Sequence, residues 1–179
     1  MIVIGYSGHA YVACSILTAS GIVVSGYCDH EEKKANPLSL PYIGSENNSA
    51  VQEQLRRAGC FIAVGDNHIR RKVYNTLQSV SVQPVNAVHP SAVITPHAQV
   101  AHGNVMIGAG VIINPFALIE TGAICNTRSV IEHECTVGAF AHIGPGAVLC
   151  GNVQVGEGAF IGAAAVFRQG IRIGAHAMI

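Results

Sequence analysis

The chain has 179 residues, half of them hydrophobic and 11% charged, and ten basic and ten acidic side chains give it a formal net charge of zero. This composition provides a core for one or two domains and lacks the signature of disorder. The neutral balance argues against a nucleic-acid-binding protein, which normally carries a basic patch. Basic residues cluster only at 33–34, 56–57 and 70–72, and we interpret all three clusters as solvated helix faces.

The N-terminus and the cysteines bear on the compartment. The apolar segment 1–5 is far too short for a signal peptide or a membrane span, and no later apolar run is long enough to span a membrane. The six cysteines include no CxxC pair. We therefore expect reduced thiols in a cytoplasmic protein, rather than a disulfide framework.

Residues 1–80 alternate between short apolar runs and segments with helical spacing. Strands are predicted at 2–4, 22–28 and 60–64, and helices at 10–20, from Asn47 or Ser49 to Ala58, and from about residue 67 to residue 78. Strands that alternate with helices predict a small parallel sheet of the βαβ type. We therefore expect an α/β, Rossmann-like domain over residues 1–82.

From Ile107 to Ile179 the chain follows a six-residue period. Eleven of the thirteen positions in this series are Ile, Val or Leu, and the position two residues earlier is mostly alanine. Neither a helix nor an alternating sheet has this period. It is typical of a hexapeptide β-helix, whose flat turns stack on one another. Residues 83–179 are therefore predicted to form an all-β domain of hexapeptide repeats.

The repeat also has an irregular start and an abrupt end. Three hexads make one triangular coil, so roughly five coils fit between Val88 and Ile179. The period begins at Val88 but slips by one residue before Ile107, which predicts a bulge or a looser corner in the first coil. The repeat stops within a hexad, and an uncapped solenoid end exposes apolar rungs. We therefore expect a C-terminal piece to be missing.

A glycine-rich loop, Gly5–His9, joins the first predicted strand to the first helix. The backbone N–H groups of such a turn lie at the positive end of a helix and suit a phosphate. The loop is not the dinucleotide fingerprint, because Ser7 replaces the second glycine. Asp29 ends the second strand, where a ribose-binding acid would lie, and Gly65 follows a strand at the same edge of the sheet. This spacing fits either a nucleotide site or a purely structural turn.

Glu132, His133 and Glu134 interrupt the hexad pattern with three polar residues in a region almost free of charge. A histidine on a solenoid is usually an exposed corner residue, which is the alternative interpretation. Flanking carboxylates would orient the imidazole and increase its basicity, as a general base requires. We therefore predict that His133 is a general base.

A zinc site and a cysteine nucleophile are the competing hypotheses for this region. His97, His102 and His133 could form a zinc site of the carbonic-anhydrase type on a β-helix, but the slip after Val100 disrupts their alignment. Cys135 lies in the interior small-residue column and would point away from solvent. We favour the histidine base and expect no bound metal.

With these residues in place, the chain resembles the sialic acid O-acetyltransferase and bacillosamine N-acetyltransferase family of bacterial sugar-modifying enzymes. The resemblance extends over essentially the whole chain, in the stretches IVIGYSGHA, YCD, FIAVGDN and CNTRSVIEHECTVG. The last stretch is the most specific, because hexapeptide repeats alone would indicate only an acyltransferase. Within the family, the chain is most similar to the UDP-4-amino-sugar N-acetyltransferases of bacillosamine biosynthesis.

The resemblance implies an architecture and a set of site residues. The family β-helix is left-handed and forms a homotrimer, with the active site between neighbouring β-helices. The UDP portion of the substrate would be held by Ser7, Gly8, His9, Asp29 and Gly65. His133 would be the base, Glu134 would orient it and Asn126 would contact the sugar, while His142, Gly151 and Ala163 would hold acetyl-CoA.

The implied reaction is acetyl-CoA-dependent N-acetylation of the C4 amine of a UDP-4-amino-4,6-dideoxy-N-acetylhexosamine, without a covalent intermediate. His133 would remove the proton as the amine attacks the thioester, and a backbone N–H near Gly151 would stabilise the oxyanion. Three alternatives stay open: O-acetylation of sialic acid or a related sugar, a metal-dependent hydratase on the same β-helix, and a non-catalytic assembly module that senses a nucleotide.

Overall fold

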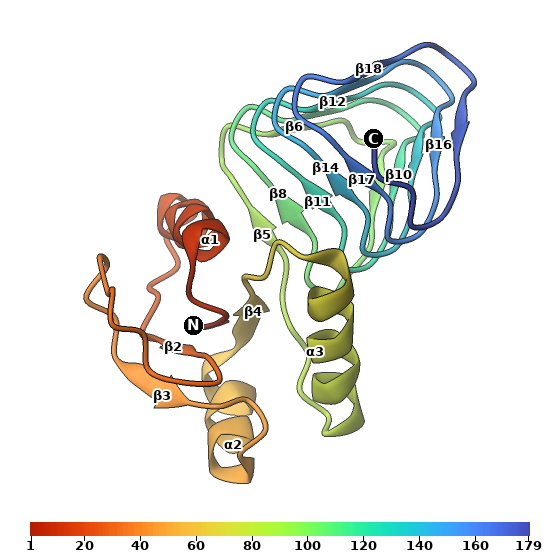
Figure 1. Cartoon of the computed structure of the whole chain (residues 1–179). Helices are drawn as coiled ribbons and strands as arrows, with labels where there is room; N and C mark the ends of the chain where they lie inside the picture. The colour runs from red at the N-terminus through yellow and green to blue at the C-terminus, as the bar shows by residue number, and fades with distance from the viewer.

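The computed structural model describes residues 1–179 and shows two bodies side by side, an α/β body formed by the N-terminal part and a parallel β-helix formed by the rest (Figure 1). Helix α3 ends at Ser79 and strand β5 begins at Ala87. The boundary expected after residue 82 falls in the segment between them. None of the helices is long and apolar enough to cross a membrane.

The sheet of the α/β body has four parallel strands in the order β3-β2-β1-β4. Its strands are β1 (Ile2–Ile4), β2 (Gly26–Cys28), β3 (Tyr42–Gly44) and β4 (Cys60–Ile62). The parallel βαβ arrangement is confirmed, but only the last three residues of the predicted strand 22–28 are β-strand. Strand β3 was not predicted: unlike β1 and β4, which are fully buried apolar runs, it is half-buried and ends in a glycine.

Three helices surround this sheet: α1 (Gly8–Ala19), α2 (Ser49–Ala58) and α3 (Asn67–Ser79). The cap of α2 is Asn48, between the two residues that the sequence suggested, and its side chain accepts a hydrogen bond from the Ala50 N–H. Asp66 caps α3 in the same way, through the Ile69 N–H. Such caps satisfy backbone donors that have no partner within the helix.

The β-helix has three sheets of five parallel strands each. We call them the docked face, which packs against the α/β body, the aliphatic face, whose outward side chains are aliphatic, and the polar face, whose outward side chains are mostly polar. The docked face contains β5 (Ala87–Val88), β8 (Met106–Ile107), β11 (Ile124–Cys125), β14 (His142–Ile143) and β17 (Phe160–Ile161). The aliphatic face contains β6 (Val93–Ile94), β9 (Ile112–Ile113), β12 (Val130–Ile131), β15 (Val148–Leu149) and β18 (Val166–Phe167). The polar face contains β7 (Gln99–Val100), β10 (Leu118–Ile119), β13 (Thr136–Val137), β16 (Gln154–Val155) and β19 (Arg172–Ile173).

The interior of the β-helix matches the six-residue pattern. In most strands the second residue and the residue two positions before it belong to one continuous core cluster. Ile94 of β6 is an exception and is 37% exposed. Cys125 and Cys135 lie in this cluster, as the sequence predicted, and all six cysteines are free. The expectation of about five coils is also confirmed by the five strands of each sheet. Handedness stays a prediction from the family resemblance.

The one-residue slip in the repeat has a structural cause. Ala87 pairs with Met106, nineteen residues on, whereas Met106 pairs with Ile124, eighteen residues on. The extra residue lies in the turn before β8, where Asn104 is completely buried. Its side-chain Oδ1 accepts a hydrogen bond from Ile62 N at 2.6 Å and its Nδ2 donates to Ile62 O at 3.2 Å. The extra residue therefore allows the Asn104 amide of the β-helix to hydrogen-bond with the backbone edge of β4.

Apolar packing and a buried arginine join the two bodies. Ala87, Met106 and Ile124, which point outward from the docked face, share one core cluster with residues of α1 and β1. In Figure 1, α1 lies next to β5 and β8, and α3 lies under the same end of the β-helix. Arg70 of α3 is completely buried at this junction. The interpretation of residues 70–72 as a solvated helix face is therefore wrong at Arg70.

Candidate active site

A crevice is expected at the carboxyl edge of the α/β sheet. Strand β1 pairs with β2 on one side and with β4 on the other, so the chain changes direction across the sheet at β1. Ligands of open α/β sheets bind at such switch points, outside the carboxyl ends of the strands. The loops after β1 and β4 meet there, and a Cβ on Gly5, whose φ is +88°, would lie 2.8 Å from Val64 Cγ2. Only glycine allows this approach.

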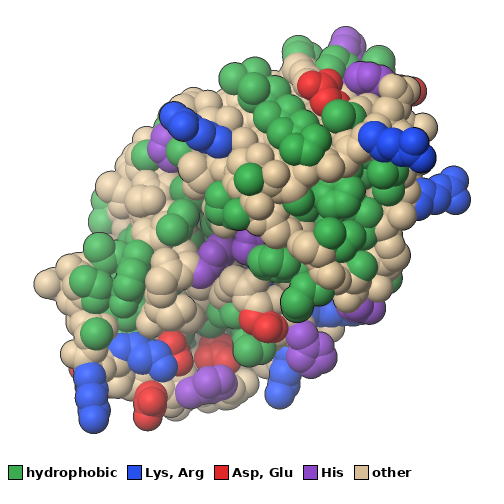
Figure 2. All heavy atoms as spheres, turned by 45° about the horizontal axis from the view of Figure 1, so that its top comes forward, with side chains coloured by type: hydrophobic (Ala, Val, Ile, Leu, Met, Phe, Trp, Pro, Cys, Tyr) green, Lys and Arg blue, Asp and Glu red, His purple; other side chains and the backbone are tan.

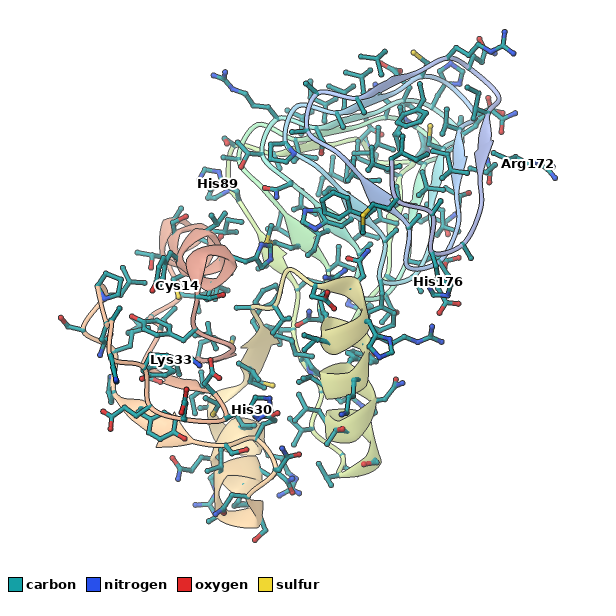
Figure 3. All side chains as sticks on the ribbon, in the orientation of Figure 1. Cys14, His30, Lys33, His89, Arg172 and His176 are labelled. Carbon is teal, nitrogen blue, oxygen red and sulfur yellow. The ribbon has the colours of Figure 1, made fainter.

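Asp29 holds the loop after β1 in place. Its Oδ2 accepts a hydrogen bond from Tyr6 N at 3.0 Å, and its Oδ1 accepts one from His30 N at 2.8 Å. Lys33 Nζ lies 3.0 Å from the same Oδ1 and is seen within the α/β body in Figure 3. The carboxylate thus stabilises the shape of the crevice, and its contact with a nucleotide stays a prediction.

Ser7, Gly8 and His9 begin α1 at this edge. Ser7 is the N-cap, but its side chain makes no capping hydrogen bond, and a Cβ on Gly8 would meet nothing within 4 Å. His9 packs against the loop after β4, because a Cβ on Gly65 would lie 3.3 Å from His9 Cγ. The space in front of Ser7 and Gly8 is therefore open, while His9 and Gly65 form its wall.

His142 lies at the border between this crevice and the β-helix. It is the outward residue of β14 on the docked face and is only 7% exposed. Its ring is 6.0 Å from that of His9 and 5.0 Å from that of Phe160, measured between centroids. Figure 2 shows histidine side chains at the junction of the two bodies.

The hydrogen bonds of Asn126 define the state of His142. Asn126 Oδ1 accepts a hydrogen bond from Thr127 N at 2.8 Å, so the amide nitrogen is the group that faces His142. This Nδ2 lies 3.1 Å from His142 Nε2. Because an amide nitrogen can only donate, Nε2 must be the acceptor and the imidazole must be neutral. His142 is thus a neutral, fixed group rather than a mobile base.

The electrostatics agree with a neutral imidazole. Burial lowers the pKa of His142 to about 4, and the positive charge of Arg70 adds to the effect. Burial and Arg70 also lower the pKa of His9 to about 4. A histidine normally titrates near 6.5, so both rings are uncharged at neutral pH.

His133 and Glu134 lie elsewhere, on the corner between the aliphatic and polar faces. His133 Nδ1 is 3.0 Å from Glu134 Oε2, and both side chains are at least half exposed. The next coil leaves room for the ring, since a Cβ on Gly151 would lie 2.5 Å from His133 Cε1 and 2.6 Å from Nε2. The carboxylate lies against Nδ1, and Nε2 lies over Gly151 of the next coil. The role of His133 as a general base stays a prediction.

The structure therefore divides the predicted site residues into two groups. His9, Gly65, Asn126 and His142 come together at the docked face. His133, Glu134 and Gly151 come together on the corner that lies opposite this face of the triangular prism. The two groups do not meet within one chain.

Two features of the docked-face region escaped the sequence analysis. A cavity of about 660 Å³ lies beside His142, between the start of α3 and the last coils, and its lining includes Gly65, Asn67, Phe160 and His176. Figure 3 shows His176 on the side of the β-helix that faces α3. The second feature is Arg70, and its place within a cationic run gave no signal of burial.

Ala163 follows β17 at the corner between the docked and aliphatic faces, and its contact with acetyl-CoA stays a prediction.

No group of three or more His, Cys, Asp or Glu side chains within the chain is arranged to hold a metal ion. His97 stacks on Phe116 with 5.5 Å between ring centroids. His133 is occupied by Glu134. A metal-dependent hydratase would need a ligand set that one chain does not provide.

Known proteins share both bodies of this structure. Residues 1–77 match the family model of the PglD N-terminal domain. GDP-perosamine N-acetyltransferase of Escherichia coli O157:H7 is 33% identical over 116 residues, which are 62% of this chain and 49% of that protein. The chain thus spans about half the length of this curated relative.

Two solved structures cover nearly the whole chain. A histidine-to-asparagine variant of perosamine N-acetyltransferase from Caulobacter crescentus, in complex with CoA and GDP-perosamine, is 37% identical with a TM-score of 0.90, over 99% of this chain and 83% of that one. The acetyltransferase domain of PglB from Neisseria gonorrhoeae, in complex with acetyl coenzyme A, is 27% identical with a TM-score of 0.88, over 99% of this chain and 85% of that one. The fold and these likenesses define a hexapeptide-repeat acyltransferase scaffold joined to a Rossmann-like body. The chain belongs to the family of sugar N-acetyltransferases.

The lowered pKa values of His9 and His142 predict a protein that loses stability in mild acid. Both groups titrate near 4 in the folded state and near 6.5 when unfolded, so between these values the unfolded chain binds protons that the folded chain does not. Stability is therefore unaffected above about pH 6.5 and falls as the pH drops towards 4, by about 1.4 kcal/mol for each pKa unit and group. Melting temperatures measured from about pH 7.5 to about pH 4.5 test this.

Two variants make the test specific. His142→Asn removes one titrating group, so its melting temperature should fall less between these pH values than that of the native chain. His102→Asn changes an exposed histidine and should leave the fall unchanged. An equal fall in all three proteins would show that His142 does not carry the effect.

Proposed function

We propose that this protein is an acetyl-CoA-dependent N-acetyltransferase that acts on the C4 amine of a nucleoside-diphosphate-linked 4-amino sugar. The observation that carries the proposal is the His133–Glu134 pair, with its free Nε2 edge and the clearance that Gly151 provides. The two solved structures named above are acetyltransferases with CoA or acetyl-CoA bound, which supports acetyl-CoA as the co-substrate.

The chemistry needs a base and a donor for the oxyanion. The substrate amine must be neutral before it attacks, because a protonated amine has no lone pair. His133 Nε2 then accepts the proton that the nitrogen loses as it attacks the acetyl carbonyl. Glu134 holds Nδ1–H and favours the imidazolium that forms. A backbone N–H near Gly151 stabilises the oxyanion. The imidazolium returns this proton to sulfur as the C–S bond breaks, so CoA leaves as the thiol and no covalent intermediate is needed.

The distance between the two groups of site residues supports a site made by two chains. The crevice at the docked face and His133 on the opposite corner cannot serve one substrate within one monomer. The outward positions of the aliphatic face are all β-branched and aliphatic, namely Val93, Ile112, Val130, Val148 and Val166. A monomer rarely exposes such a continuous column, and we propose that it packs against other copies in a homotrimer.

The family resemblance and the relatives indicate different nucleotides for the substrate. The resemblance implies a UDP-linked 4-amino-4,6-dideoxy sugar of the bacillosamine type, with Ser7, Gly8, His9, Asp29 and Gly65 around the nucleotide and Asn126 near the sugar. By contrast, one relative is named for GDP-perosamine, and another is a perosamine N-acetyltransferase in complex with GDP-perosamine. We retain UDP as the proposed nucleotide and treat GDP as the alternative that these relatives favour.

A thiol-release assay tests the proposed function. With acetyl-CoA as donor, we expect turnover with UDP- or GDP-linked 4-amino sugars and none with the free amino sugars. The preferred nucleotide should also raise the melting temperature, because a ligand that binds only the folded state stabilises it by about 2.7 kcal/mol at a hundred times its Kd. Turnover with free sialic acid alone would favour O-acetylation, and stoichiometric zinc in the purified protein would favour a hydratase.

Loss of the base should remove the chemical step. We expect His133→Ala to lower kcat by roughly 10²- to 10⁴-fold, the usual contribution of general-base catalysis. Gly151→Ala should also lower kcat, because the new methyl group occupies the position of the imidazole. Gly174→Ala is the matched control, since its Cβ would meet nothing within 4 Å. An unchanged kcat in His133→Ala, with the oligomer intact, would rule out this base.

Mixed oligomers test the shared site. Gly8→Phe should block the crevice without disturbing the fold, since the space in front of Gly8 is open, and His133→Ala should remove the base. Each variant alone is expected to be inactive. When the two are co-expressed, about a quarter of the sites in randomly mixed rings combine an intact crevice with an intact base from another chain. Activity that stays absent in the mixture would place the whole site within one chain.

A further inference from the structure

Arg70 is a completely buried cation at the junction of the two bodies. All of its donors are used. Nε donates to Gly122 O at 2.8 Å, Nη1 to Val64 O at 3.1 Å and Gly65 O at 2.9 Å, and Nη2 to Asn67 Oδ1 at 2.9 Å and Phe140 O at 2.8 Å. No carboxylate is among these acceptors. The guanidinium therefore acts as a fork that reaches backbone carbonyls of both bodies at once.

Burial of a cation without a counterion is an unfavourable contribution to the junction of the two bodies. Burial lowers the pKa of Arg70 to about 10, against a smaller opposite effect of Asp66, so the group stays charged at neutral pH. A buried charge without a counterion costs several kcal/mol unless hydrogen bonds offset it. Asn104 joins the same two bodies with a neutral amide that bonds to both backbone groups of Ile62. Docking by itself therefore does not require an arginine.

The acceptors of Arg70 lie in the candidate site. Val64 and Gly65 form the loop after β4, which is one wall of the crevice. Phe140 precedes His142 by two residues on the approach to β14. The fifth acceptor, Asn67, in turn donates through Nδ2 to Gly158 O at 3.0 Å and Ala159 O at 3.1 Å, one coil further along. One side chain thus connects the crevice loop with the coil that presents His142.

Arg70 also acts on this site through its charge. It contributes to the low pKa of both His9 and His142. The other charged or titratable groups that act on these three residues are Asp66, which opposes the effect on Arg70, and His9 itself, which acts on His142. A positive charge at this place favours neutral imidazoles, and the hydrogen bond between Asn126 and His142 requires a neutral ring.

We propose that Arg70 is a positioning residue of the acetyl-transfer site, which holds the Gly65 loop and His142 at a fixed separation so that the crevice fits its substrate. This inference rests on the proposed function for its kinetic consequence. The structural part, that Arg70 fixes the loop and adds to the effect of burial on the two imidazoles, stands independently of any turnover.

Two substitutions separate the fork from the charge. Arg70→Met removes both, whereas Arg70→Lys keeps the charge but offers a compact ammonium that cannot reach both bodies in the same way. In both variants we expect KM for the nucleotide sugar to rise about tenfold or more, with a smaller change in kcat, because His133 is on the other corner. The pKa of His9 and His142, followed by NMR titration of the imidazole signals, should rise in Arg70→Met and stay low in Arg70→Lys.

Asn104→Ala is the matched control. It weakens the same junction at Ile62 but touches neither the Gly65 loop nor His142. It should lower the melting temperature while KM and the histidine titrations stay as in the native protein. If Arg70→Met and Arg70→Lys change only the melting temperature, as Asn104→Ala does, Arg70 is merely structural and the inference is wrong.

A failure of this inference can be distinguished from a failure of the proposed function. If the native protein turns over no amino sugar, KM is replaced by calorimetric binding of UDP and GDP, and the histidine titrations are unaffected. Should Arg70→Met fail to fold, Arg70→Lys still reports on the fork, because a native KM and native nucleotide binding in that variant would overturn the proposal.

Discussion

The narrow interior of the β-helix is the constraint on which the rest of the structure depends. Most coils offer aliphatic and small side chains to the interior, where they form one continuous buried cluster. The interior columns hold almost only apolar side chains, although Ser129 places a buried hydroxyl there. The polar side chains of the candidate site lie on outward positions or on corners. His142 takes the first kind of place and His133 the second. Cys135 points into this interior and is completely buried, so it has no surface to present to a substrate as a nucleophile.

The junction of the two bodies turns this regular prism into a site. Apolar outward residues of the first coils, Met106 and Ile124, pack against the α/β body. On the next coil the same outward position is His142, which therefore meets the crevice loops rather than a hydrophobic core. The Arg70 guanidinium connects the crevice loop with the coil that presents His142, whereas Asn104 joins only the edge of β4 to the first coils. The hydrogen bonds of Arg70 thus fix the geometry of the site, while the apolar contact between the two bodies stabilises the junction.

The division of the site between the docked face and the opposite corner follows from the same geometry. A triangular prism whose one face is covered by its own α/β body can offer a free base only on its remaining corners and faces. Symmetric assembly would bring the corner of one chain to the crevice of the next, and the aliphatic column provides the apolar surface for such packing. Substrate binding and proton transfer would then belong to different copies of one sequence.

Much of this architecture was determined by the sequence alone, because periodicity and caps are local properties. The six-residue period predicted the interior columns, the coils and the slip, and the glycine and polar signals predicted the helices to within a few residues. The polar break at Glu132–Glu134 identified the exposed histidine pair. Strand β3 was missed, and the strand that ends at Cys28 was predicted to begin too early, because Ile22 and Val24 pack against the core without belonging to a strand. Only the tertiary structure decided that Arg70 is buried, that Asp29 braces a loop, and that His142 and His133 are apart. The physical reason is that burial of an outward side chain depends on what docks against it, and docking joins residues that no local pattern relates.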